Sequence, residues 1–171
     1  EERQHILGLL RGDLVEYKGP PTLKQLFEEQ AQRTPNNVAL EFHDTKVTYA
    51  ELDRWSNQVA WELREKHGVK ADVLVGLVAE RTIETMVGML GIIKAGGAYL
   101  PIDPEWPKQR VLLINSDAHI GAIVCGLDQD DRYSRFGMST VVVGHASATL
   151  PCSALVSLDS AGSLAYVIFT S

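Results

Sequence analysis

The chain has few of the features that mark secreted proteins. Only two of its 171 residues are cysteines, Cys125 and Cys152. The opening residues EERQHILGLLRGD are charged and amphipathic, so they do not resemble a secretory signal peptide. These observations favour free thiols in a reducing compartment over a disulfide, and we expect a cytoplasmic protein. Cys125 ends the apolar run IGAIVC, which predicts a buried and unreactive thiol.

Long apolar runs, clusters of positive charge and metal-ligand spacings are lacking too. No uninterrupted apolar stretch approaches the roughly 20 residues of a membrane span. The net charge is −6 and no Lys/Arg cluster is present, which argues against nucleic acid or an anionic membrane as a partner. The five histidines are too scattered to predict a metal site or a histidine-based triad; they are His5, His43, His67, His119 and His145.

Hydrophobic residues make up 45% of the chain, which is enough for the core of one domain. Strand and helix patterns alternate between residues 73 and 125, which predicts an α/β fold with a largely parallel sheet flanked by helices. The expected strands are 38–42, 46–48, 73–79, 98–102, 120–125, 140–144 and 164–169, with 155–158 a weaker candidate. The expected helices begin at Thr22, Thr48, residue 82 and Pro107.

Helix ends are marked by capping residues. Thr22 with Gln25, and Thr48 with Glu51, have the spacing of capping boxes, in which each side chain satisfies a free backbone N–H. Gly68 is expected to end the second helix, because glycine adopts the left-handed conformation at a helix C-terminus without strain. The first helix is predicted to bury Leu23, Leu26, Phe27 and Ala31, and the third to bury Ile83, Met86, Val87, Leu90 and Ile93.

Three segments resemble the first three core motifs of nonribosomal peptide synthetase adenylation domains, in order and in spacing. They are VTYAELDRWSNQVAWELR at 47–64, IIKAGGAYLPIDPEWPKQR at 92–110 and LAYVIFTS at 164–171. The resemblance covers essentially the whole chain and places it in the adenylate-forming superfamily. It implies an interdomain linker at 1–20, following a condensation domain. Residues 21–171 are then the N-terminal part of an AMP-binding domain, an incomplete large subdomain truncated where the phosphate loop begins.

The resemblance implies an ATP-dependent ligase. An amino acid is activated to aminoacyl-AMP with the help of Mg²⁺, and then passes to the phosphopantetheine of a carrier domain in the same synthetase. Thr170 and Ser171 would open the loop that holds the ATP phosphates, and they are the cofactor-binding residues expected in this chain. The family's catalytic groups and the amino-acid pocket lie downstream. We therefore expect no catalytic residue and no metal ligand here, and a fragment that is inactive alone.

Other motif residues have structural interpretations that we favour over functional ones. Lys94 is expected to complement a helix C-terminus, and Glu51 to cap a helix. Tyr99 is expected to pack, and Asp103 to form a turn. Glu80 follows a strand, where a helix-terminal charge or a salt bridge is the simpler interpretation.

Two other functions remain open from the sequence. The chain could be a non-catalytic remnant or interaction module that docks a synthetase, or part of an acyl-CoA synthetase-like ligase for a fatty or aryl acid. A continuation of the type GSTGKPKG with a carrier domain would favour the peptide synthetase. An early stop codon would favour the remnant, and absence of a carrier domain would favour the acyl-CoA synthetase-like ligase.

Overall fold

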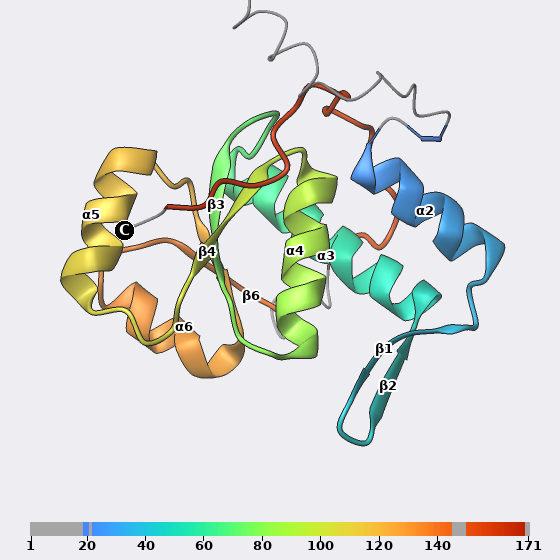
Figure 1. The fold of residues 1–171 in the computed structure, drawn as a ribbon, viewed down its shortest axis with the longest axis horizontal. Coiled ribbons are helices and arrows are strands. Elements are labelled where there is room, and N and C mark those ends of the chain that lie inside the picture. The colour runs from blue at the N-terminus through green and yellow to red at the C-terminus, as the bar shows by residue number, and fades with distance from the viewer. Residues whose placement is uncertain (1–18, 21, 145–149, 170–171) are drawn as a thin grey trace, which may run out of the picture.

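A parallel four-stranded sheet lies at the centre of the computed structural model, which describes residues 19–20, 22–144 and 150–169 (Figure 1). The strand order is β4-β3-β5-β6, and each neighbouring pair is parallel. The strands are β3 (Leu74–Val78), β4 (Ala98–Ile102), β5 (Ile123–Cys125) and β6 (Thr140–Val142). The predicted α/β architecture with a parallel sheet is thus confirmed.

Helices cover both faces of this sheet. The first core cluster contains residues of α3 (Tyr49–His67) and α4 (Ile83–Ala95), and the second contains residues of α5 (Lys108–Ala118) and α6 (Leu127–Ser134). Helix α2 (Leu23–Arg33) contacts α3 and α4. An antiparallel hairpin of β1 (Val38–Phe42) and β2 (Thr45–Thr48) leads into α3. None of the described helices combines the length and the apolar character needed to cross a membrane.

Alternation along the strands divides the core. Val75 and Leu77 of β3 belong to the α3–α4 side, whereas Val78 belongs to the α5–α6 side. In β5, Val124 lies on the first side and Cys125 on the second. All five side chains are buried, as expected for parallel strands covered on both faces.

The helix ends largely follow the predicted caps. The Thr48–Glu51 capping box is complete, and Gly68 ends α3 in the left-handed conformation at φ 61°. Only half of the box expected at α2 is present. Thr22 accepts a hydrogen bond from the backbone N–H of Gln25, but the Gln25 side-chain oxygen is buried without a partner.

The predicted strands at 155–158 and 164–169 were overestimated. No strand forms at 155–158, and 164–169 makes a single bridge, between Tyr166 and Tyr99 of β4. The described pairing with β4 consists of two backbone hydrogen bonds, both made by Tyr99, and this is too short a ladder for a strand. Past the bridge the chain runs toward α5 (Figure 1).

The buried face of α4 was predicted only in part. Val87 and Ile93 are buried, but Met86 is 36% exposed. Gly88 and Gly91 lie on the inner face instead, where an added Cβ at Gly91 would come within 2.5 Å of Val59 Cγ1. Gly91 lets α4 approach α3 closely, and Gly88 lets it approach the sheet, where an added Cβ would meet Val124 and Leu77.

Candidate functional site

The approach to the predicted phosphate loop runs along the edge of β4. Tyr99 N–H donates to the carbonyl of Ala165 at 3.1 Å, and Val167 N–H donates to the carbonyl of Tyr99 at 3.0 Å. The rings of Tyr99 and Tyr166 stack with centroids 5.6 Å apart. Tyr99 is therefore a packed residue, as expected. Thr170 and Ser171 themselves lie outside the described residues.

The last described residues alternate between two environments. Ala165, Val167 and Phe169 are half-buried, and Phe169 packs against the α5–α6 cluster. The alternate side chains are apolar and face solvent; they are Leu164, Tyr166 and Ile168, which are 50%, 53% and 62% exposed. This period of two is typical of an extended segment with one covered face.

The carboxyl ends of the strands carry acidic residues. Glu80 follows β3, and its carboxylate accepts a hydrogen bond from Gln129 at 3.0 Å. Burial, followed by the charge of Asp128, raises the pKa of Glu80 above its usual range. Asp103 follows β4 and accepts from the backbone N–H of Glu105 at 2.8 Å, which confirms it as a turn former. Carboxylates repel phosphates, so the carboxyl ends of β3 and β4 do not by themselves offer a site for ATP.

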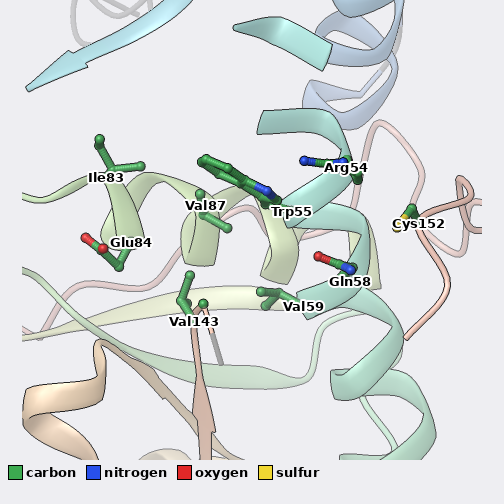
Figure 2. A pocket seen from close by; sticks show the side chains of 10 residues that line it. Arg54, Trp55, Gln58, Val59, Ile83, Glu84, Val87, Val143 and Cys152 are labelled. Carbon is green, nitrogen blue, oxygen red and sulfur yellow. The ribbon is translucent and has the colours of Figure 1, made fainter. Parts of the chain in front are cut away.

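A cleft of about 500 Å³ opens between α3 and α4, close to the end of β6 (Figure 2). Its lining is part apolar and part polar; the residues are Arg54, Trp55, Gln58, Val59, Ile83, Glu84, Val87, Val143, Gly144 and Cys152. Among the described residues of the lining, none is a histidine that could serve as a base for the Cys152 thiol. The described part of the cleft therefore has shape and some charge, but it forms no nucleophile–base pair.

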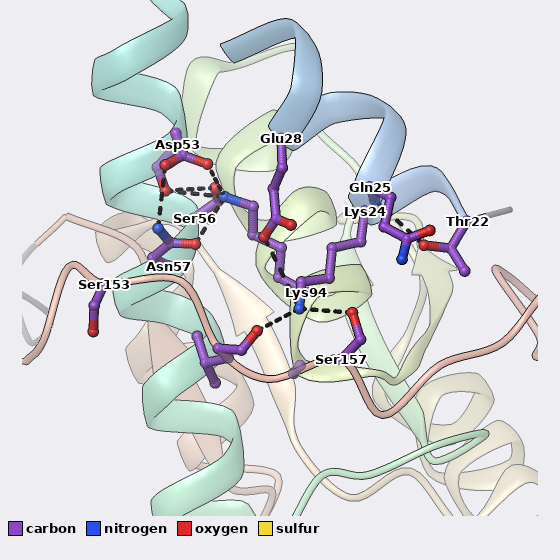
Figure 3. A network of polar contacts seen from close by, with 12 residues as sticks. Thr22, Lys24, Gln25, Glu28, Asp53, Ser56, Asn57, Lys94, Ser153 and Ser157 are labelled. Atoms are coloured by element: carbon purple, nitrogen blue, oxygen red, sulfur yellow. Dashed lines mark hydrogen bonds and ion pairs between the residues drawn. The ribbon is translucent and has the colours of Figure 1, made fainter. Parts of the chain in front are cut away.

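Lys94 lies at the centre of a buried polar network (Figure 3). Its ammonium donates to Asp53 Oδ1 at 2.6 Å and to Asn57 Oδ1 at 2.8 Å, and it lies 5.0 Å from the ring centroid of Phe27. Burial lowers the pKa of Lys94, and the bonded Asp53 carboxylate partly offsets this. The helix C-terminus expected for Lys94 is served instead by Arg64, whose guanidinium donates to the Ala95 carbonyl at 2.9 Å.

Lys24 is a second buried lysine, which the sequence pattern missed. The predicted inner residues Leu23 and Leu26 are 51% and 46% exposed, whereas Lys24 is 1% exposed. Its ammonium donates to the carbonyl of Leu155 at 2.5 Å. Burial lowers the pKa of Lys24. The carboxylate of Glu28, 3.9 Å from the ammonium, offsets this decrease only in part. A lysine beside an apolar stripe gives no sequence signal that it points inward.

Metal ligands do not gather in the described part of the chain. Between residues 22 and 144 and between 150 and 169, no group of three or more His, Cys, Asp or Glu side chains could hold a metal ion. Both cysteines have free thiols, with Cys125 buried and Cys152 exposed.

Comparison with known proteins connects this scaffold to one enzyme family. The AMP-binding enzyme family matches residues 27–171. Bacitracin synthase 2 of Bacillus licheniformis is 38% identical over the whole chain, which spans 6% of that protein. Gramicidin S synthase 2 of Brevibacillus brevis is 40% identical over the whole chain, which spans 4% of that protein.

Solved structures give the same result. The nonribosomal peptide synthetase FmoA3 in its AMPPNP-bound form superposes with a TM-score of 0.86 at 30% identity, covering 100% of this chain and 18% of FmoA3. A second FmoA3 structure, bound to alpha-methyl-L-serine-AMP, matches with a TM-score of 0.86 over 99% of this chain and 19% of that one, also at 30% identity. The chain therefore belongs to the AMP-binding enzyme family, among the adenylation domains of nonribosomal peptide synthetases.

Proposed function

We propose that this chain is part of an adenylation domain that activates an amino acid with ATP. The amino-acid carboxylate attacks the α-phosphorus of ATP, a P–O bond forms, and pyrophosphate leaves, which yields aminoacyl-AMP. The observation that carries the proposal is the path of residues 164–169 along β4 toward Thr170 and Ser171, on a scaffold that superposes on FmoA3. FmoA3 itself is known in complex with AMPPNP and with an aminoacyl-AMP.

Thr170 and Ser171 would contribute to this reaction by binding phosphate. Hydroxyl and backbone N–H groups donate hydrogen bonds to phosphate oxygens, and such bonds are strong because the acceptor is charged. The sheet contributes positioning, because catalysis of this displacement depends on holding the reacting groups in place. The remaining groups of the reaction would come from outside residues 1–171.

The proposal includes cofactors and partners. Residues 1–20 would be a linker from a condensation domain, and 21–171 the adenylation part. The product would pass to the phosphopantetheine of a carrier domain. Mg²⁺ would assist the adenylation, but the described residues hold no carboxylate cluster that fits it, and we assign no step to it. The two free thiols support a cytoplasmic location.

A hybrid enzyme tests the proposed function. The chain is joined to the rest of the adenylation domain of gramicidin S synthase 2, and amino-acid-dependent ATP–pyrophosphate exchange is measured. We expect exchange from the hybrid and none from the 171-residue chain alone. An inactive but folded hybrid would contradict the proposal.

The double variant Thr170→Ala/Ser171→Ala refines this test. Exchange should fall at least about tenfold, since losing a hydrogen bond to a charged oxygen costs about 1.5–3 kcal/mol. The matched control is Ser116→Ala, which removes an exposed hydroxyl from α5 and should leave exchange unchanged. Equal activity of the double variant and the control would remove the phosphate-binding role from this pair.

A further inference from the structure

Residues 150–163, which we call the strap, directly precede the segment that leads to the phosphate loop. The strap contains no helix or strand, so it has no backbone ladder of its own. It is nevertheless attached to the core, because Leu155 is only 6% exposed and belongs to the α3–α4 cluster. Something other than secondary structure must therefore fix its course.

Side chains of α2 and α3 supply these attachments. Lys24 donates to the Leu155 carbonyl at 2.5 Å and to the Ser157 hydroxyl at 3.1 Å (Figure 3). Trp61 donates from its indole N–H to the Ser153 carbonyl at 2.9 Å. Each bond joins residues more than ninety positions apart, so it ties the strap to the scaffold rather than to itself.

Asn57 makes the attachment that depends on the family motif. Its Nδ2 donates to the Cys152 carbonyl at 2.9 Å and to Asp53 Oδ2 at 3.3 Å. Its Oδ1 accepts from Lys94 at 2.8 Å. A lysine ammonium can only donate, so Lys94 forces the amide oxygen toward itself and the amide N–H groups toward the strap.

The other end of the strap delivers the chain to the sheet. Leu164 N–H donates to Asp72 Oδ1 at 2.8 Å, and the next residue begins the pairing with Tyr99 of β4. Thr170 then follows only six positions after Leu164. The course of the strap thus bears directly on where the phosphate loop begins.

We propose that Asn57, oriented by Lys94, is a positioning residue that holds the strap and thereby sets the start of the phosphate loop. Lys24 acts in the same way at the middle of the strap. This gives the lysine of the KAGG motif a role that acts through Asn57 rather than on a ligand. The inference rests on the proposed function, because only a phosphate loop gives this positioning a catalytic consequence.

Hydrogen exchange on the full 171-residue chain tests the attachment without any ligand. Asn57→Asp keeps an oxygen for Lys94 but replaces the donor to Cys152 with a second acceptor. Backbone amides of the strap should exchange about tenfold faster, the factor expected for the loss of one net hydrogen bond. Amides of α5 should be unaffected. Lys24→Met provides a second variant. Lys46→Met in the hairpin is the control, since among the described residues Lys46 pairs only with exposed Glu41.

Steady-state exchange kinetics of the hybrid enzyme test the consequence. In Asn57→Asp and in Lys24→Met, the KM for ATP should rise about three- to tenfold, while kcat and the KM for the amino acid change little. A general loss of structure would instead lower the active fraction and with it kcat. Lys46→Met should leave all three constants unchanged.

The outcomes distinguish a failure of the positioning role from a failure of the proposed function. Unchanged strap exchange in both variants, or faster strap exchange with an unchanged KM for ATP, would overturn the inference while leaving the proposed function intact. An unmodified hybrid without activity would overturn the proposed function, and hydrogen exchange would then still decide whether Asn57 and Lys24 hold the strap.

Discussion

At the residue scale, two buried lysines connect elements that lie far apart in the sequence. Lys24 and Lys94 are 1% and 0% exposed, and each ammonium is bonded to side-chain or backbone oxygens. A buried charge is tolerated only when it is paired and hydrogen-bonded. Lys24 links α2 to the strap and Lys94 links α4 to α3, so their charge is used to connect elements.

Replacing Lys94 tests this description. Lys94→Met should destabilise the chain by about 2–3 kcal/mol, below the 3–5 kcal/mol typical of breaking a fully buried pair. The reduction follows because Asp53 is 31% exposed and can regain water. Urea unfolding measures the loss, and Lys46→Met should change stability by less than about 0.5 kcal/mol. Equal stability of the two variants would show that the network contributes nothing.

The two cysteines should differ in reactivity. Burial raises the pKa of Cys125 to about 12, so almost no thiolate forms near pH 8, whereas Cys152 is exposed. Iodoacetamide at that pH should label Cys152 alone, as read by mass spectrometry of the native chain. Labelling of Cys125 at a similar rate would contradict its burial. The raised pKa also has a consequence for stability. The contribution of Cys125 to the free energy of unfolding is fully present below pH 9.0, and it is lost as the pH rises toward about 12.

At the element scale, the contact of α3 with α4 organises one side of the molecule. Gly91 faces Val59, and the absence of a side chain there allows the two helices to meet. Arg64 of α3 caps the last carbonyls of α4, which reinforces the same contact. The capping box at Thr48 fixes where α3 begins, directly after the hairpin.

Gly91→Ala should disturb this contact. The new Cβ would come within 2.6 Å of Val59 Cβ, and relief requires a shift of one helix, at a cost of about 1–3 kcal/mol. Gly121→Ala is the matched control, because its nearest neighbour would be 3.4 Å away. Thermal unfolding of both variants would show the difference, and a neutral Gly91→Ala would mean that the helices are less tightly packed than described.

At the scale of the whole molecule, one apolar edge stands out. Leu164, Tyr166 and Ile168 face solvent beside β4, at the edge of a parallel sheet. Exposed apolar residues on a strand edge favour association with another strand. We therefore expect the isolated chain to self-associate through this edge.

Ile168→Lys should weaken that association. A charge on the exposed side of this extended edge segment opposes pairing with a second copy. Sedimentation velocity over a dilution series should show a larger monomer fraction than for the parent chain. Val156→Lys is the control, since Val156 is 81% exposed but belongs to the strap and not to the edge residues 164–168. A monodisperse parent monomer would contradict the expectation.

Local signals in the sequence were enough to determine the α/β class, the limits of β4, the capping box at Thr48 and the glycine that ends α3. Each depends on residues only a few positions apart, so propensity and backbone geometry decide them. The family was likewise readable from three short motifs. Tertiary structure alone decided that Lys24 and Lys94 point inward, that Met86 does not, and that 164–169 makes one bridge instead of a strand. The hydrogen bonds of the two lysines, for example, reach partners 37 to 133 residues away, and the residues next to a lysine in the sequence do not encode such a partner.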